Sequence, residues 1–566
     1  MWNKVFKLRE GHQLLAQFLV IQQSRPQLVD KLAETIGNYE MAVTPRSLFA
    51  TDGTLLIPSD KSSFMKEIEQ YSRQAGGDDL QIAVSCANDS REEAEPEMDS
   101  QPVSDNPQLD REDTTEGMAE QAVLSEMDGQ SNNQGSINRD KVIIIDGQAV
   151  VQSLTKLPGM DTICALGDAF LKRIDGMTRR YAEGRVIFDR YITGSLKEKT
   201  RAKRAGSTQP VKFIIQDQMS IRNVSMKMLL SHTDTKSQLT EYLGKRLLDH
   251  FAGSNKGLVV VYETSTLSNK EGVFDPDLSM HTHEEADTQI PLHVLDATEQ
   301  STSIRDIYVW SPDTDVFLLL IDLVATCTVE GNVKLLTGRG KFYRTIDVKK
   351  ICVVIGSEKS KALIGLHNFT GADWGGKFFN ISKKAWIKEF LVLIPTDDIV
   401  GTFQRLGSVD TPDELALKHM ERFVCKVYSS KSSCITVSDL RWELFRTKNF
   451  EGEKLPPTQN TLKPHIMRAN FMSKRDKSYK EPRPILPHPN KNGWEQKADG
   501  KLEPVRCLAK PAPQAVLELV KCGCKGSCGL KAKCSCHKNG LSCTALCKCA
   551  DCGNIPDYRI VLDEDL

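Results

Sequence analysis

The stretch 283–315 constrains the fold most strongly, because it places acidic residues on both sides of a short apolar run. The run 307–310 is typical of a buried strand. The proline that follows cannot continue a central strand and favours a helix capped by Ser311. Asp313 and Asp315 are therefore expected at the carboxyl end of a strand, where open α/β sheets bind ligands. Two solvated acidic turns are the simpler alternative.

Apolar runs next to acidic residues recur along the chain, and they predict the fold class. Strands are expected at 142–145, 186–188, 211–215, 258–262, 307–310 and 333–336, and helices at 239–251 and 361–369. Strands that alternate with helices favour an α/β fold with a mostly parallel sheet flanked by helices. In such a sheet, the carboxyl ends of the parallel strands meet at one edge.

Seven carboxylates are candidates for a site at that edge. They are Asp146, Asp189, Glu285, Asp287, Asp313, Asp315 and Asp373. Like charges gathered in this way raise each other's pKa and oppose folding. Oxygen-rich clusters are stable where a hard divalent cation, such as Mg²⁺ or Mn²⁺, lies between the carboxylates. The pattern therefore favours a metal site.

A basic segment follows the strand that ends at Asp189. If residues 196–204 are helical, Lys197, Arg201 and Arg204 share one face, because they lie four and three residues apart. Such a face fits the phosphates of a nucleic acid, and an ordinary solvated helix is the alternative. The whole chain has 74 Lys and Arg against 75 Asp and Glu. This balance excludes a uniformly basic coat but allows local basic patches.

In their order along the chain, the acidic motifs resemble those of the PIN-like nucleases, specifically the flap-endonuclease branch. The motifs are 145–146, 188–190, 285–287, 313–315 and 371–374, within about residues 140–395. The resemblance implies a nuclease with two Mg²⁺ or Mn²⁺ ions, and it places the basic pair of the family's helical arch on Lys197 and Arg204. One ion would lie among Asp146, Asp189, Glu285 and Asp287, and the other among Asp313, Asp315 and Asp373.

The resemblance is incomplete at two places. Glu284 and Asp287 share a helix face, whereas Glu285 and Asp287 do not, so either glutamate can be the ligand. The family's helix-hairpin-helix turn has two glycines that let backbone amides approach phosphates. The corresponding segment here contains Lys383 and Lys384 but neither glycine. These two lysines are the expected substrate contacts in this segment.

The carboxyl-terminal segment contains a dense group of cysteines. Nine of the 16 cysteines are Cys522, Cys524, Cys528, Cys534, Cys536, Cys543, Cys547, Cys549 and Cys552. The first residues lack the apolar core of a signal peptide, so we expect an intracellular protein whose reduced cysteines bind metal instead of forming disulfides. Nine thiolates can hold about three zinc ions if three of them bridge, because each zinc takes four ligands.

The cysteine spacing resembles the CXC domain of the tesmin and TSO1 proteins, a small zinc module that binds DNA. This chain has one copy where those proteins have two, and Lys533 stands where the family has a tyrosine. We therefore expect the lysines to contact the phosphates of DNA, without base-specific recognition. A zinc-bound tail that only stabilises the chain end is the alternative. Together, the two halves are similar to a group of animal proteins, some derived from mobile elements, that pair a PIN-like region with a CXC tail.

Six segments are expected. They are an N-terminal α/β extension at 1–77, an acidic disordered linker at 78–139, a PIN-like nuclease domain at 140–422, a helical and proline-rich connection at 423–520, a CXC zinc domain at 521–553 and a tail at 554–566. The resemblances imply a nuclear, metal-dependent nuclease that acts on DNA, with RNA as an open alternative and no membrane association. A catalytically inactive nuclear DNA-binding protein built on a nuclease-type scaffold is the second hypothesis.

Overall fold

The computed structural model describes residues 14–15, 17–58, 62–75, 138–154, 156, 159–192, 210–300, 304–373, 375–448, 454–518, 522–524, 534–541, 543, 547–549 and 554. These residues belong to two compact units. The sheet unit comprises 62–364 and 475–486, and the helical unit comprises 1–61, 365–474 and 487–566. The expected acidic linker lies outside the described residues up to position 137.

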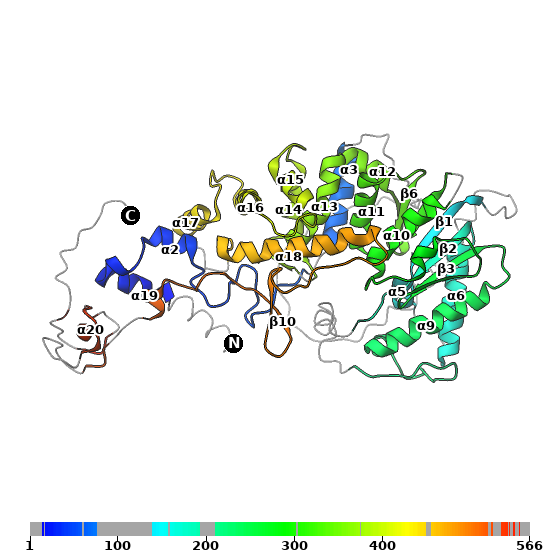
Figure 1. Cartoon of the computed structure of the whole chain (residues 1–566), viewed down its shortest axis with the longest axis horizontal. Helices are drawn as coiled ribbons and strands as arrows, with labels where there is room; N and C mark the ends of the chain where they lie inside the picture. Colours follow the sequence, from blue (N-terminus) through cyan, green and yellow to red (C-terminus); the bar gives the residue numbers. More distant parts are fainter. Residues whose placement is uncertain are drawn as a thin grey trace, which may run out of the picture. The chain divides into compact units, whose positions relative to one another are not determined.

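A single seven-stranded sheet forms the centre of the sheet unit, with the strand order β4-β3-β2-β1-β5-β6-β7 (Figure 1). The strands are β1 (Asn138–Asp146), β2 (Tyr181–Ile187), β3 (Gly257–Tyr262), β4 (Ser265–Ser268), β5 (Asp306–Trp310), β6 (Val333–Thr337) and β7 (Arg344–Asp347). The central strands β3, β2, β1, β5 and β6 are parallel, and the edge strands β4 and β7 are antiparallel. The predicted class, α/β with a mostly parallel sheet, is confirmed.

The strand order reverses at β1. The chain moves from β1 to β2 and β3 on one side and then returns to β5 and β6 on the other side. The carboxyl ends of β1 and β5 therefore flank the point where open α/β sheets bind ligands. The acidic residues that the sequence places after these strands lie at this point.

Helices cover both faces of the sheet (Figure 1). The helices of the sheet unit are α3 (Ser62–Ala75), α5 (Gly147–Ser153), α6 (Ile163–Thr178), α8 (Met226–Leu229), α9 (Thr233–His250), α10 (Ala286–Glu299), α11 (Thr314–Thr326), α12 (Val348–Ile355) and the first part of α13 (Ser357–Gly371). On one face, α6 and α9 enclose an apolar core with the side chains of Ile143 and Ile145 from β1. On the other face, α10 packs against β1, β2 and β5, next to α11.

The strand predicted at 211–215 does not form. This segment is extended, but its amides donate to side chains of α9 instead of to another strand: Phe213 N–H to Thr235 Oγ1 at 2.9 Å, and Ile215 N–H to Gln238 Oε1 at 3.2 Å. Phe213 and Ile215 therefore pack against the apolar core that includes α9, whereas Val211 is exposed. From an alternating apolar run alone, a strand in a sheet cannot be distinguished from a segment that packs against a helix.

The helical unit consists mainly of helices and of a two-stranded ribbon. Its elements are α2 (Leu32–Asn38), the last part of α13, α14 (Lys383–Leu391), α15 (Asp398–Arg405), α16 (Glu414–Tyr428), α17 (Val437–Lys448), α18 (Gln459–Lys477) up to residue 474, β9 (Trp494–Gln496), β10 (Leu502–Pro504), α19 (Gln514–Leu517) and α20 (Ser535–Lys538). The buried guanidinium of Arg441 donates to the Ile36 and Tyr39 carbonyls, so α17 holds α2. Within the described part of the chain, no helix is long and apolar enough to cross a membrane.

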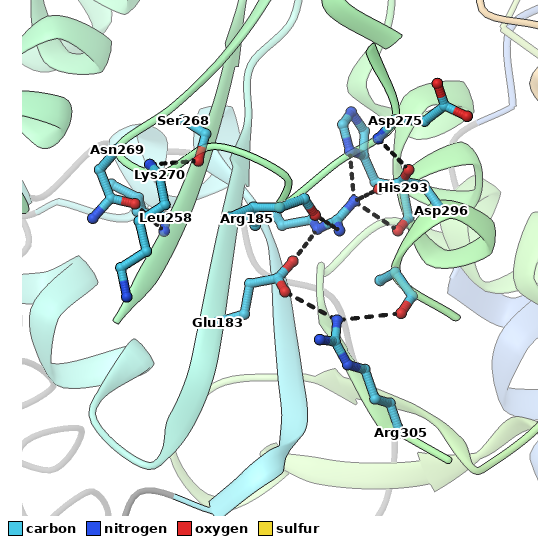
Figure 2. A network of polar contacts seen from close by, with 12 residues as sticks. Glu183, Arg185, Leu258, Ser268, Asn269, Lys270, Asp275, His293, Asp296 and Arg305 are labelled. Carbon is cyan, nitrogen blue, oxygen red and sulfur yellow. Dashed lines mark hydrogen bonds and ion pairs between the residues drawn. The ribbon is translucent and has the colours of Figure 1, made fainter. Parts of the chain in front are cut away.

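A buried polar network fixes α10 on the sheet (Figure 2). Arg185 of β2 is fully buried and forms ion pairs with Glu183, at 2.6 Å, and with Asp296 of α10. Arg305 lies 3.1 Å from the second oxygen of Glu183. The Arg185 guanidinium also contacts His293 on the same helix. Because α10 begins beside the acidic edge of the sheet, this network sets the position of its first turn.

Replacing Arg185 with methionine should destabilise the sheet unit by about 3–5 kcal/mol, because it leaves Asp296 as a buried charge without its partner and Glu183 with Arg305 alone. Native-state hydrogen exchange measures this loss of stability, which should appear as faster exchange of the α10 and β2 amides. The matched control is Lys212→Met, which breaks a half-exposed pair with Asp234 and should leave those amides unchanged. Unchanged exchange in Arg185→Met would show that the network does not hold α10.

Candidate metal centre

Asp146 ends β1 and is one of the buried carboxylates of the site. Its Oδ1 accepts a hydrogen bond from Ala149 N–H at 2.8 Å, which caps α5, and its Oδ2 accepts from the Ser311 hydroxyl at 3.2 Å. Burial, together with the charges of Asp189 and Asp313, raises the pKa of Asp146 to about 7. The two hydrogen bonds only partly offset this rise. Asp146, Asp189 and Asp313 are therefore close enough to interact strongly.

Asp189 follows β2 and connects this strand to the start of α10. Its Oδ1 accepts from Ala286 N–H, the first residue of α10, at 2.9 Å. A first-turn amide that donates a hydrogen bond to a carboxylate stabilises a helix start. Asp287 lies in this first turn. The Asp189 side chain thus holds α10 where Asp287 reaches the carboxyl edge of the sheet.

Asp313, and not Ser311 as predicted, caps the helix after β5. The Asp313 Oδ1 accepts from Asp315 N–H at 2.9 Å, and α11 begins at Thr314. Ser311 has another role, because its hydroxyl accepts from Asp313 N–H at 3.1 Å and donates to Asp146. The prediction was wrong by two residues, because a serine and an aspartate on either side of a proline are both good caps. Ser311 instead links the ends of β1 and β5.

Three carboxylates converge at this edge. Asp287, Asp313 and Asp315 each offer an oxygen, and the three oxygens lie within 4.8 Å of one another. All three side chains are partly exposed. Asp287 and Asp315 lie in the first turns of α10 and α11, where the helix dipole favours negative charge. Three closely spaced, accessible carboxylates are a donor set that suits a hard divalent cation such as Mg²⁺ or Mn²⁺. On the resemblance to the nucleases, Asp287 was instead expected to bind a different ion from Asp313 and Asp315.

Glu285 lies beside a positively charged side chain of the protein, that of Arg475. It is buried at the start of α10, and its Oε1 lies 3.6 Å from the Arg475 guanidinium. Arg475 belongs to the last turn of α18, and its Nε and Nη2 donate to Asp476 Oδ1 at 2.9 and 2.5 Å. Glu284 is only partly buried. Sequence reasoning missed Arg475, because an arginine beside an aspartate at a helix end is a common surface pattern.

The histidines beside the acidic edge have structural roles. His283 Nε2 lies 2.8 Å from the Glu481 carbonyl, which can only accept, so Nε2 carries the proton. Its Nδ1 lies 2.9 Å from the Thr288 hydroxyl. Burial lowers the pKa of His283 to about 4 and that of His281 to about 3, so both rings are neutral near pH 7.

Asp373, Lys383 and Lys384 belong to the helical unit. Asp373 lies in a turn closed by bridges between Gly371 and Lys377 and between Ala372 and Gly376. Lys383 is buried, with its ammonium 2.8 Å from His367 Nδ1, whereas Lys384 is exposed. The site roles given to these residues stay predictions. Lys197, Arg201 and Arg204 lie outside the described residues, as do Cys528 and Cys552.

The described cysteines of the tail form two groups that could each hold a metal ion. Cys522, Cys534, Cys536 and Cys543 are one group of four, and Cys522, Cys543, Cys547 and Cys549 are another. The sulfur atoms of Cys534 and Cys543 lie 3.7 Å apart, and those of Cys522 and Cys543 lie 3.9 Å apart. Thiolates at about 2.3 Å from one zinc are about 3.8 Å apart in a tetrahedron. The two groups share Cys522 and Cys543, as bridging thiolates would. Cys524 lies beside them.

The pKa of Asp146 predicts a pH dependence in the protein without added divalent metal. Its carboxyl has a pKa of about 7 in the folded state against 3.8 for an ordinary aspartate. The folded state therefore holds a proton that the unfolded state has released, and stability should fall as the pH rises from about 4 to 7, by on the order of 1.4 kcal/mol per pKa unit.

Asp146→Asn should raise the melting temperature at pH 8 but not at pH 4, because the amide resembles the protonated carboxyl. Thermal unfolding at both pH values tests this. Asp249→Asn, at the exposed end of α9, is the control and should change neither value. An Asp146→Asn variant that is less stable than wild type at pH 8 would contradict the prediction.

Comparisons with known proteins identify no family. No protein-family model matches the chain. No curated protein matches it either. A solved structure described as the catalytic core of Rad2 in complex with DNA substrate (complex III) is similar at 14% sequence identity and a TM-score of 0.27. The match covers 61% of this chain and 92% of that chain.

Proposed function

We propose that the chain is a divalent-metal-dependent nuclease that cleaves the phosphodiester bonds of DNA. The observation that carries this proposal is the convergence of Asp287, Asp313 and Asp315, with oxygens within 4.8 Å of one another, at the carboxyl edge of a mostly parallel sheet. Asp146 interacts with this group through the Ser311 hydroxyl. Carboxylates assembled from three different strand and helix ends are costly to fold unless they bind a cation.

Each residue has a distinct role in this proposal. A bound Mg²⁺ or Mn²⁺ would supply charge stabilisation at the phosphate and an activated water. Asp287, Asp313 and Asp315 would hold the ion, and Ser311 and Asp189 would position the strand and helix ends that carry them. The helices α10 and α11 begin at this edge, and the positive ends of their dipoles favour an anionic substrate.

The contacts with DNA would come from other parts of the chain. We assign phosphate binding to Lys197, Arg201 and Arg204, and to the exposed Lys384 in the helical unit, because Lys383 is buried against His367. The cysteine-rich tail would bind about three zinc ions as a CXC-type module and contact duplex DNA through its lysines, which implies a nuclear protein.

A second function, DNA binding without cleavage, is favoured by one observation. Glu285, a predicted metal ligand, is already paired with Arg475. A scaffold that had lost its metal ions could be stabilised in this way. In that case, the zinc-bound tail would be the part of the chain that binds DNA.

A nuclease assay separates the two functions. The purified full chain is incubated with flap, hairpin and duplex DNA, and with matching RNA, in Mg²⁺, Mn²⁺ or EDTA. The proposal expects cleavage of a DNA substrate with Mn²⁺ and none with EDTA. Tight DNA binding with no cleavage in either metal would favour the second function.

A further inference from the structure

Arg25 contacts the cysteine-rich tail from a distant part of the sequence. Its guanidinium donates a hydrogen bond to the sulfur of Cys536 and lies close enough for its charge to act on this atom. Both residues belong to the helical unit and both are buried, with 2% of Arg25 and 0% of Cys536 exposed. An arginine is seldom buried so deeply unless it is paired. A thiolate bound to zinc accepts from a guanidinium more strongly than a neutral thiol does, so this contact suits a metal-bound Cys536.

The backbone around Arg25 is held in place. The Arg25 N–H donates to the Ile21 carbonyl at 2.6 Å, and the Arg25 carbonyl accepts from Leu28 N–H at 2.9 Å. Residues 17–24 are helical, and the side chains of Phe18 and Ile21 on this segment are buried. Because packing already orders the segment, the contact with Cys536 costs little further conformational entropy.

Cys536 lies where the two four-cysteine groups meet. It belongs to the group that contains Cys522, Cys534 and Cys543, and its sulfur lies 3.6 Å from that of Cys547 in the other group. Together the two groups contain six different cysteines. Two Zn²⁺ ions would bring four positive charges and six thiolates would bring six negative ones, so the filled cluster is anionic. A cation that donates to a ligand atom stabilises such a cluster and fixes the orientation of the ligand.

We propose that Arg25 is part of the zinc module, where its guanidinium holds the Cys536 sulfur and offsets the negative charge of the zinc–thiolate cluster. This inference rests on the zinc binding proposed for the tail. Arg25 is a positioning residue, because it acts through the sulfur and not on the zinc. Donation to the sulfur makes this atom less basic, so it leaves the zinc less readily. The module therefore extends beyond the segment 521–553 that the cysteine spacing defines.

The rate at which a chelator removes zinc tests this proposal. Full-length, zinc-loaded protein is mixed with excess EDTA, and the zinc that remains bound is counted over time by native mass spectrometry. Arg25→Gln should load as much zinc as the wild type but release it about tenfold faster or more, because it lacks the charge. Arg25→Lys keeps the charge but not the planar fork, and it should release zinc at an intermediate rate. Arg422→Gln, which breaks an ion pair with Asp397 in the same unit, is the control and should release zinc at the wild-type rate.

Substitution of zinc by Co²⁺ adds a spectroscopic measurement. The thiolate-to-cobalt charge-transfer absorption moves to longer wavelength when the sulfur atoms become richer in electrons. Arg25→Gln should therefore shift this band to longer wavelength, whereas Arg422→Gln should leave it unchanged. A merely structural role of Arg25 in the amino-terminal segment would not move the band.

The outcomes separate the role of Arg25 from the zinc binding itself. A folded Arg25→Gln variant with the release rate and the absorption band of the wild type would overturn the role of Arg25. If Arg25→Gln does not fold, Arg25→Lys decides, and release at the wild-type rate would overturn the role of the guanidinium. A wild-type protein that binds no zinc would instead contradict the zinc binding proposed for the tail.

Discussion

Replacing Asp313 and Asp315 together with asparagine should reduce DNA cleavage by at least about a thousandfold. Losing a bound ion removes several kcal/mol of transition-state stabilisation, and each 1.36 kcal/mol is a factor of ten in rate. DNA affinity should be unchanged or higher, because two negative charges near the phosphates are removed. Single-turnover cleavage and equilibrium binding, measured on the same flap substrate with Mn²⁺, separate these two effects.

The matched control for this double variant is Asp306→Asn. Asp306 lies on the same strand, β5, but at its amino end, where it accepts from Asn332. Cleavage by this control should equal that of the wild type. If the double variant cuts as fast as the wild type, the observed activity comes from another site or from a contaminant, and the residue assignment is wrong.

Cys543→Ser should cost the tail two zinc ions, whereas Cys534→Ser should cost one, because Cys543 belongs to both four-cysteine groups and Cys534 to one. Structural zinc contributes about 10–16 kcal/mol of folding free energy in small zinc modules. The Cys543 variant should therefore lose the folded structure of the tail. Native mass spectrometry counts the zinc ions, and limited proteolysis reports the folding.

Cys425→Ser is the control for the cysteine variants. Cys425 is also buried, but it lies on α16 and outside both groups. Its replacement should leave the zinc content unchanged. Equal zinc loss in Cys534→Ser and Cys543→Ser would contradict the shared role of Cys543.

The sequence predicted the parts of the site that depend on strand ends. An apolar run followed by an acidic residue places Asp146, Asp189 and Asp313 at one edge of any parallel sheet, so this edge could be inferred without a structure. The convergence of Asp287 with Asp313 and Asp315 depends on where α10 begins. Its start is set by Asp189, a residue about a hundred positions earlier in the chain.

Two features could not be predicted, for different physical reasons. The segment 211–215 has the alternation of a strand, but its amides bind α9 side chains, and local pattern cannot choose between these partners. Arg475 reaches Glu285 across 190 positions of sequence, and no local signal marks such a contact. Long-range pairing of charges is visible only once the fold is known.

The link between Asp146 and Ser311 also determines when the site can form during synthesis. These residues are 165 positions apart, and they meet only after β5 has paired with β1. Contacts between distant residues form late, because a long loop must close first. A chain still emerging from the ribosome could fold β1, β2 and β3 together, yet it would lack Asp313 and Asp315. On the proposed function, the nascent chain is therefore expected to cleave no nucleic acid until its synthesis has passed Asp315.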